Sequence, residues 1–137
     1  MNAKKDDIMK RLKTLAVNTA KLCLKFSYNV VNKTYIGQIV RCSSSASANY
    51  RAACRGKSKA DFVNKLRIVE EELDETMHFY ELPAEFNEPY KNELRTLFIE
   101  VNELLSITVA SINTTNKNIV AEKQNVLKSK INPKSAI

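Results

Sequence analysis

The chain has 137 residues, enough for one domain with a sizeable hydrophobic core and no need of a disulfide or metal for stability. Hydrophobic residues make up 44% and charged residues 27%, and only two glycines and three prolines occur, which favours a helical globular protein over a turn-rich β fold. The net charge of +7 predicts attraction to phosphate or to acidic protein surfaces.

The cysteines and the lack of long apolar segments predict a cytoplasmic protein. Cys23, Cys42 and Cys54 are odd in number and widely spaced, so neither a disulfide framework nor a zinc ribbon fits and a reducing compartment is expected. The first residues, MNAKKDD, lead into an amphipathic pattern instead of the apolar core of a signal peptide. No apolar run approaches the roughly 18 residues of a membrane span, so no membrane partner is expected.

The first helix is predicted near residues 5–31. Its apolar positions alternate spacings of four and three, which places them on one helix face: Ile8, Leu12, Leu15, Thr19, Leu22 and Phe26. The other faces carry Lys10, Lys13, Lys21 and Lys25. The stretch VVNKTY breaks this register, so Asn32 is predicted as a turn residue and Thr34 as the next N-cap.

The second helix is predicted to run through the serine-rich stretch SSSASA, residues 43–48. The same spacing of three and four continues through the serines: Ile36, Ile39, Ser43, Ala46, Tyr50 and Ala53. Small residues allow a neighbouring backbone to approach closely, and a serine hydroxyl can bond to a carbonyl in the preceding turn. The stretch is therefore interpreted as buried helix, not as a linker. Because this helix has few large apolar residues, it is either the most tightly packed or faces another copy of the chain.

The third helix is predicted to begin after Gly56, with Ser58 as its N-cap, and to end before Pro83. The fourth is predicted to begin after Pro89. Both keep the same spacing, the third through Phe62, Leu66, Val69, Leu73, Thr76 and Tyr80, and the fourth through Leu94, Phe98, Val101, Leu105, Thr108 and Ile112.

The predicted fold is an all-α, up-down-up-down antiparallel four-helix bundle, residues 1–118, followed by a basic extension, residues 119–137. A spacing of seven from Ile112 to Ile119 and Val126 favours a long fourth helix that ends before Pro133. The Asn- and Thr-rich stretch SINTTNKN and the following lysines leave disorder as the alternative for the extension.

No catalytic or metal-binding constellation is expected. Glu75 and His78 form the Glu-x-x-His element of diiron bundles, but such sites need two of these elements and His78 is the only histidine. A Cys-His or Ser-His pair would need the same histidine, and no glycine-rich turn presents a nucleophile or cradles phosphate. The chain is therefore predicted to be non-enzymatic and without a cofactor, and His78 is predicted to be a surface or interfacial residue.

Charge is segregated along the chain, and basic side chains gather where the second helix meets the third. Arg41, Arg51 and Arg55 lie on the second helix, and the third carries an acidic stretch at residues 70–75. The arginines either pair with carboxylates, within or between subunits, or contact nucleic-acid phosphate. The candidate nucleic-acid contacts are Lys10, Lys13, Lys21, Lys25, Arg55, Lys57, Lys59, Lys123, Lys128 and Lys130.

Four stretches resemble the bacterial four-helix-bundle family of 23S ribosomal RNA intervening-sequence proteins. They are QIVR at residues 38–41, ANYRAACR at 48–55, KSKADF at 57–62 and LRIVEEELDET at 66–76. The resemblance implies a small non-enzymatic bundle that forms a homopentamer around a central channel. The chain is also distantly similar to the accessory variability protein of diversity-generating retroelements, a basic pentamer that binds a reverse transcriptase and nucleic acid.

The resemblance implies a structural or interface role, not a catalytic one, for residues on the second and third helices. With their neighbours, the candidate interface or ion-pair residues are Arg41, Asn49, Tyr50, Arg51, Arg55, Arg67, Glu71, Glu72, Asp74 and Glu75. The chain departs from the family pattern by its serine-richer second helix and by the tail after residue 118. Two hypotheses follow: an oligomeric accessory factor for RNA or DNA, or an interaction protein whose charges serve assembly and protein docking.

Overall fold

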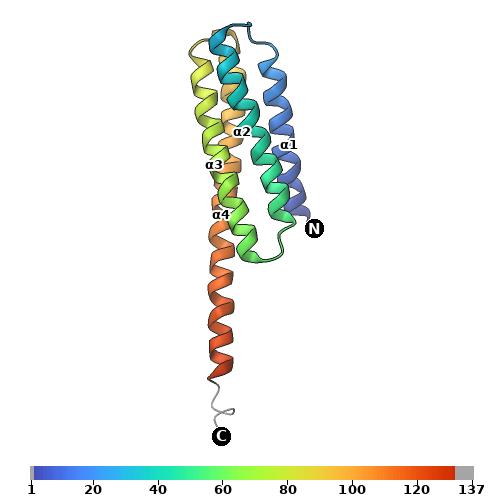
Figure 1. Ribbon diagram of the computed structural model, residues 1–137, viewed down its shortest axis with the longest axis vertical. Helices are drawn as coiled ribbons and strands as arrows, with labels where there is room; N and C mark the ends of the chain where they lie inside the picture. Colours follow the sequence, from blue (N-terminus) through green and yellow to red (C-terminus); the bar gives the residue numbers. More distant parts are fainter. Residues whose placement is uncertain (1, 132–137) are drawn as a thin grey trace.

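The computed structural model describes residues 2–131, and within that range the chain forms helices and no strands. Four long helices are present, α1 (Ala3–Cys23), α2 (Val30–Cys54), α3 (Lys59–Ala84) and α4 (Lys91–Lys130), with a short 3-10 helix, η1 (Glu88–Tyr90), before α4. They lie side by side, with the α1–α2 and α3–α4 connections at one end and the α2–α3 connection at the other (Figure 1). The all-α fold class is confirmed.

The predicted apolar stripes form the core between the helices. All six stripe positions of the first helix are buried, as are Leu66, Val69, Leu73, Thr76 and Tyr80 on α3. Four predicted stripe positions are half-buried and pack against the core instead of lying inside it: Ile36 on α2, Phe62 on α3, and Phe98 and Leu105 on α4. Among residues 2–131, every buried side-chain nitrogen or oxygen has a hydrogen-bond partner. The Tyr80 hydroxyl, for example, lies 2.6 Å from Thr19 Oγ1 in a hydrogen bond between α3 and α1.

The serine-rich stretch lies inside α2, which confirms the helical interpretation over the linker. Ser43 is fully buried, and its hydroxyl donates to the Ile39 carbonyl at 2.8 Å, one turn earlier. Ala46 and Ala53 on the same face are buried as well. Small side chains at these positions let α2 lie close to its neighbours, with the hydroxyl satisfied within the helix.

The predicted boundary between the first two helices is wrong. α1 ends at Cys23, and α2 begins at Val30, where the Asn29 side chain accepts from the Asn32 N–H at 2.8 Å and so acts as the N-cap. Thr34, the predicted N-cap, lies in the first turns of α2, and its hydroxyl donates to the Val30 carbonyl. Phe26 lies in the connection between the two helices, but its side chain is buried, as the apolar pattern predicts.

Asn32, predicted as a turn residue, is instead buried inside α2 and paired with Asn87. The two amides bond reciprocally: Asn32 Nδ2 donates to Asn87 Oδ1 at 3.0 Å, and Asn87 Nδ2 donates to Asn32 Oδ1 at 2.8 Å. Asn32 also donates to the Ser27 carbonyl and Asn87 to the Pro83 carbonyl, each at 2.8 Å. This pair therefore joins both connections at one end of the molecule.

Ser58 is confirmed as the N-cap of α3, because its hydroxyl accepts from the Asp61 N–H at 3.1 Å. The predicted end of this helix before Pro83 is wrong, since α3 continues to Ala84. A proline in the last turn removes a single helical hydrogen bond, and the carbonyl of Pro83 remains engaged by Asn87. α4 begins after Pro89, as predicted.

α4 continues well past the other three helices (Figure 1). It remains helical through SINTTNKN to Lys130, and residues 132–137, the last part of the predicted extension, lie outside the described residues. Ile112 is buried and Ile119 half-buried, but Val126 is exposed because no other helix reaches that far. None of the helices within residues 2–131 combines the length and apolarity needed to cross a bilayer.

Candidate functional site

Arg41 is the arginine of α2 that meets the acidic stretch of α3. Its guanidinium donates to Glu72 at 3.4 Å and to Glu75, and its Nε donates to Gln38 at 3.1 Å. Partial desolvation would lower the pKa of Arg41, but the charges of Glu75 and Glu72 outweigh it and raise that pKa. The pairs are partly exposed to solvent, so they orient α2 on α3 more than they stabilise it.

Arg51 lies in the last turn of α2 and Arg55 is its C-cap residue; both are exposed, and within residues 2–131 no ion pair joins them to a carboxylate. The register of the two helices explains the difference from Arg41. Where Arg41 lies opposite Glu72 and Glu75, a residue nearer the connection lies opposite the first turns of α3, which carry Lys59 and Lys65 and only one carboxylate, Asp61. The two terminal arginines are therefore available to another molecule.

The other predicted interface residues fall into two groups. Tyr50 is buried in the core shared by the helices, whereas the half-buried Asn49 donates within α2 to the Ser45 carbonyl and hydroxyl at 2.9 and 3.1 Å. Arg67, Glu71 and Asp74 are exposed on α3, without an ion pair among the described residues. The structure thus brings together Arg41, Glu72 and Glu75 and leaves the other charges on the surface.

The lysines predicted to contact nucleic acid also fall into two groups, those paired with a carboxylate and those that are exposed. Lys25 is 3.3 Å from Glu93 of α4, and Lys59 bonds to Glu122. Lys10, Lys13 and Lys21 are exposed on α1, and Lys123, Lys128 and Lys130 are exposed on the part of α4 that projects past the bundle. Because positions 10, 13 and 21 are separated by three and eight residues, they share one face of α1. We call these three residues the α1 lysine face.

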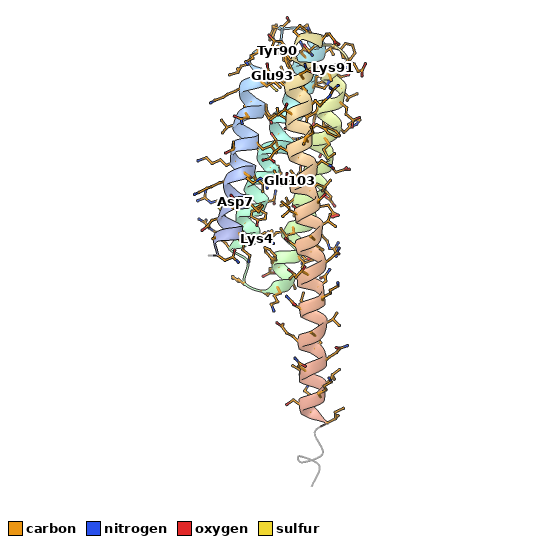
Figure 2. All side chains as sticks on the ribbon, turned by 180° about the vertical axis from the view of Figure 1, so that it is seen from behind. Lys4, Asp7, Tyr90, Lys91, Glu93 and Glu103 are labelled. Atoms are coloured by element: carbon orange, nitrogen blue, oxygen red, sulfur yellow. The ribbon has the colours of Figure 1, made fainter. Side chains whose placement is uncertain are left out.

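The contact between Arg11 and α4 has no counterpart among the predicted sites. Arg11 donates to Glu100 at 2.5 and 3.2 Å and lies 3.2 Å from Glu103, which is labelled on the part of α4 beside α1 (Figure 2). The hydrogen bond that Arg11 donates to Glu100 is the largest influence on the pKa of Arg11 and raises it. The sequence does carry a signal for this contact. Arg11 flanks the apolar stripe of α1, and Glu100 and Glu103 flank that of α4, as charged residues flank the seam of a coiled coil.

His78 is exposed, and the centroids of its ring and the Phe79 ring lie 5.2 Å apart in an edge-to-face arrangement. Among residues 2–131, no three His, Cys, Asp or Glu side chains lie close enough together to hold a metal ion. All three cysteines are free thiols; Cys23 and Cys42 are buried, and burial raises the pKa of Cys23 to about 11. Cys54 is the more accessible thiol, and burial raises its pKa too.

Comparisons with known proteins agree with this fold. The family model described as "23S rRNA-intervening sequence protein" matches residues 4–110. A crystal structure from Bacteroides thetaiotaomicron, described as a protein of unknown function from the S23 ribosomal protein family, superposes with a TM-score of 0.69 at 27% identity. The match covers 80% of this chain and 98% of that one. No curated protein matches the sequence.

Proposed function

Because the chain belongs to the family of 23S rRNA-intervening sequence proteins, we propose that it is a non-enzymatic, basic accessory protein that associates with structured RNA. The observation that carries the proposal is the α1 lysine face, Lys10, Lys13 and Lys21, which is exposed and has no ion pair within residues 2–131. The family name points to ribosomal RNA, and exposed lysines on a regular helix are the side chains that phosphate attracts.

The pairing of charges between α1 and α4 supports this choice. The carboxylates of α4 that border α1 are already engaged, Glu100 and Glu103 by Arg11 and Glu93 by Lys25. They are therefore not available to neutralise the lysines on the outer face of α1. A face whose ammonium groups make no ion pair within residues 2–131 attracts a polyanion from a distance and holds it in a salt-dependent manner.

Recognition of RNA would be electrostatic and directed by shape. A helix with lysines along one face can contact the phosphate backbone, which carries no sequence information directly. Double-stranded RNA is recognised mostly in this way, through its phosphates and its wide minor groove. We therefore expect binding to depend on the structure of the RNA and little on its base sequence.

Assembly would multiply these contacts. We propose that the chain folds as an up-down-up-down bundle and forms a homopentamer, as its resemblance to the family implies. The exposed Arg51 and Arg55 at the end of α2 and the exposed Glu71 and Asp74 on α3 have complementary charges for a contact between copies. In such a ring each subunit would add a lysine face of its own, and a reverse transcriptase would be a further candidate partner.

The second candidate function is that of an interaction protein that does not bind nucleic acid. It is favoured by the last turns of α4 and the residue that follows them, because the apolar side chains there are each more than half exposed: Val120, Val126, Leu127 and Ile131. Exposed apolar residues on one segment are typical of protein contacts. In this alternative, the charges of α2 and α3 serve assembly alone.

Native mass spectrometry of protein purified without nuclease separates the two candidates, because it reports stoichiometry and retained nucleic acid together. The accessory-factor proposal predicts an oligomer that carries RNA and loses it when the sample is washed at high salt. The interaction-protein alternative predicts an oligomer free of RNA. An RNA-free oligomer after a low-salt purification would count directly against the proposed function.

A further inference from the structure

A cleft of about 720 Å³ lies at the end of the molecule where α1 begins. Its walls come from three segments: the first turns of α1, the connection between α2 and α3, and α4 from Ile107 to Asn118. In Figure 1 the beginning of α1 and the α2–α3 connection lie at the same end, and Figure 2 labels Lys4 there, beside α4. We call this hollow the basal cleft; its size is within the range of small-molecule sites.

The floor of the basal cleft is apolar and partly aromatic. Ile8, Tyr50 and Ala53 form its buried base, and the half-buried Phe62 and Cys54 lie beside them. A flat aromatic group placed on such a floor removes its faces from water and packs against these apolar side chains. The floor therefore favours a ligand with a planar ring over a bare inorganic ion.

The rim of the basal cleft is basic. Four lysines line it, Lys4, Lys5, Lys57 and Lys59, and none of the lining residues is a carboxylate. Lys5 holds its ammonium group 4.4 Å from the Phe62 centroid, and Lys59 bonds to Glu122 just outside the cleft. Lys4 and Lys57 are exposed and have no ion pair within residues 2–131.

Hydroxyl groups from α4 complete the lining. Ser111, Thr114 and Thr115 face the cleft, and none of the hydrogen bonds between described residues uses their hydroxyls. By contrast, Ser106 and Thr108, in the preceding turns, donate to carbonyls four residues earlier. Three free hydroxyls thus lie beside two free ammonium groups, a set that suits the oxygens of a sugar and a phosphate.

We infer that the basal cleft binds a nucleoside phosphate, with the base on the floor beside Phe62 and the phosphate at Lys4 and Lys57. The ligand is either a free nucleotide or the terminal nucleotide of an RNA strand, since both present the same chemistry. The inference does not require the α1 lysine face to bind RNA, because Lys10, Lys13 and Lys21 do not line the cleft. Nucleotide binding in the cleft can therefore fail while RNA binding by α1 holds, and RNA binding by α1 can fail while nucleotide binding holds.

Cys54 is a built-in reporter for this site, because it lines the cleft while Cys23 and Cys42 are buried. The experiment measures the rate at which a maleimide modifies Cys54 at about pH 8.5, where enough thiolate forms for the reaction. The probes are adenosine and guanosine monophosphates, a short RNA with a 5′-phosphate, the same RNA with a 5′-hydroxyl, adenosine, and inorganic phosphate. A ligand at ten times its Kd leaves about a tenth of the sites free, so modification should slow about tenfold.

Protection by a mononucleotide supports a free-nucleotide site, and protection by the 5′-phosphorylated RNA alone supports a strand-end site. The Lys4→Gln, Lys57→Gln double variant should raise the Kd of the protecting probe about tenfold, because it removes two exposed charges near the phosphate. Lys33→Gln, Lys65→Gln loses the same charge from exposed positions outside both the cleft and the α1 lysine face and should leave that Kd unchanged. Equal protection by adenosine or by inorganic phosphate alone, or no protection by any probe, would overturn the inference.

Discussion

Replacing Asn87 with alanine is expected to lower the free energy of unfolding by about 2–4 kcal/mol, because it leaves buried polar groups without partners. The substitution removes the donor to Asn32 Oδ1 and the donor to the Pro83 carbonyl, and both Asn32 and Asn87 are shielded from water. Chemical denaturation followed by circular dichroism measures the change. The midpoint should fall while its slope stays the same.

Asn64→Ala is the matched control, because Asn64 is exposed on α3 and alanine is the better helix former. It should leave stability unchanged or raise it slightly. The Asn32→Ala, Asn87→Ala double variant should be less destabilised than the sum of the two single variants, since the shared pair is lost only once. Equal stabilities of Asn87→Ala and Asn64→Ala would contradict a structural role for the pair.

Neutralising the α1 lysine face in the variant Lys10→Gln, Lys13→Gln, Lys21→Gln is expected to weaken binding to a structured RNA hairpin about tenfold or more at low salt. Each exposed contact between an ammonium group and a phosphate contributes up to about 1 kcal/mol, so three contacts together exceed that factor. Fluorescence anisotropy with a labelled hairpin measures the Kd.

The control for net charge is Lys33→Gln, Lys65→Gln, Arg95→Gln, which removes the same charge from exposed positions on α2, α3 and α4. If the α1 lysine face is the contact surface, this variant should bind RNA nearly as well as the unaltered protein. Equal weakening by both triple variants would assign the effect to overall charge and remove the specific role of α1. Circular dichroism confirms that both variants remain folded.

The buried face of each helix could be predicted from the sequence, because one apolar stripe per helix leaves little choice of which side turns inward. The stripe from Ile8 to Phe26 and the serine positions of α2 lie where the spacing placed them. The boundary between α1 and α2 could not, since Asn29, Asn32 and Thr34 are all acceptable capping residues within a short stretch. The choice depends on Asn87, whose amide engages Asn32 from 55 residues away.

The charged contacts, too, could be predicted only in part. Opposite charges on adjoining helices indicated pairing between the arginines of α2 and the carboxylates of α3, and Arg41 makes such pairs. The register of a helical hairpin could have shown that Arg51 and Arg55 lie too near the connection to reach the acidic stretch. The bonds from Arg11 to Glu100, 89 residues away, depend on which helices adjoin and on how they are shifted along their axes. The periodicity of each helix gives neither.

The most direct test of RNA association is the salt dependence of binding by the unaltered protein to the structured RNA hairpin. Contacts with phosphate release counterions, so the logarithm of the association constant should fall linearly with the logarithm of the salt concentration, with a slope of about −3 or steeper if the three lysines of α1 all take part. A slope near zero, or no binding at low ionic strength, would contradict the account.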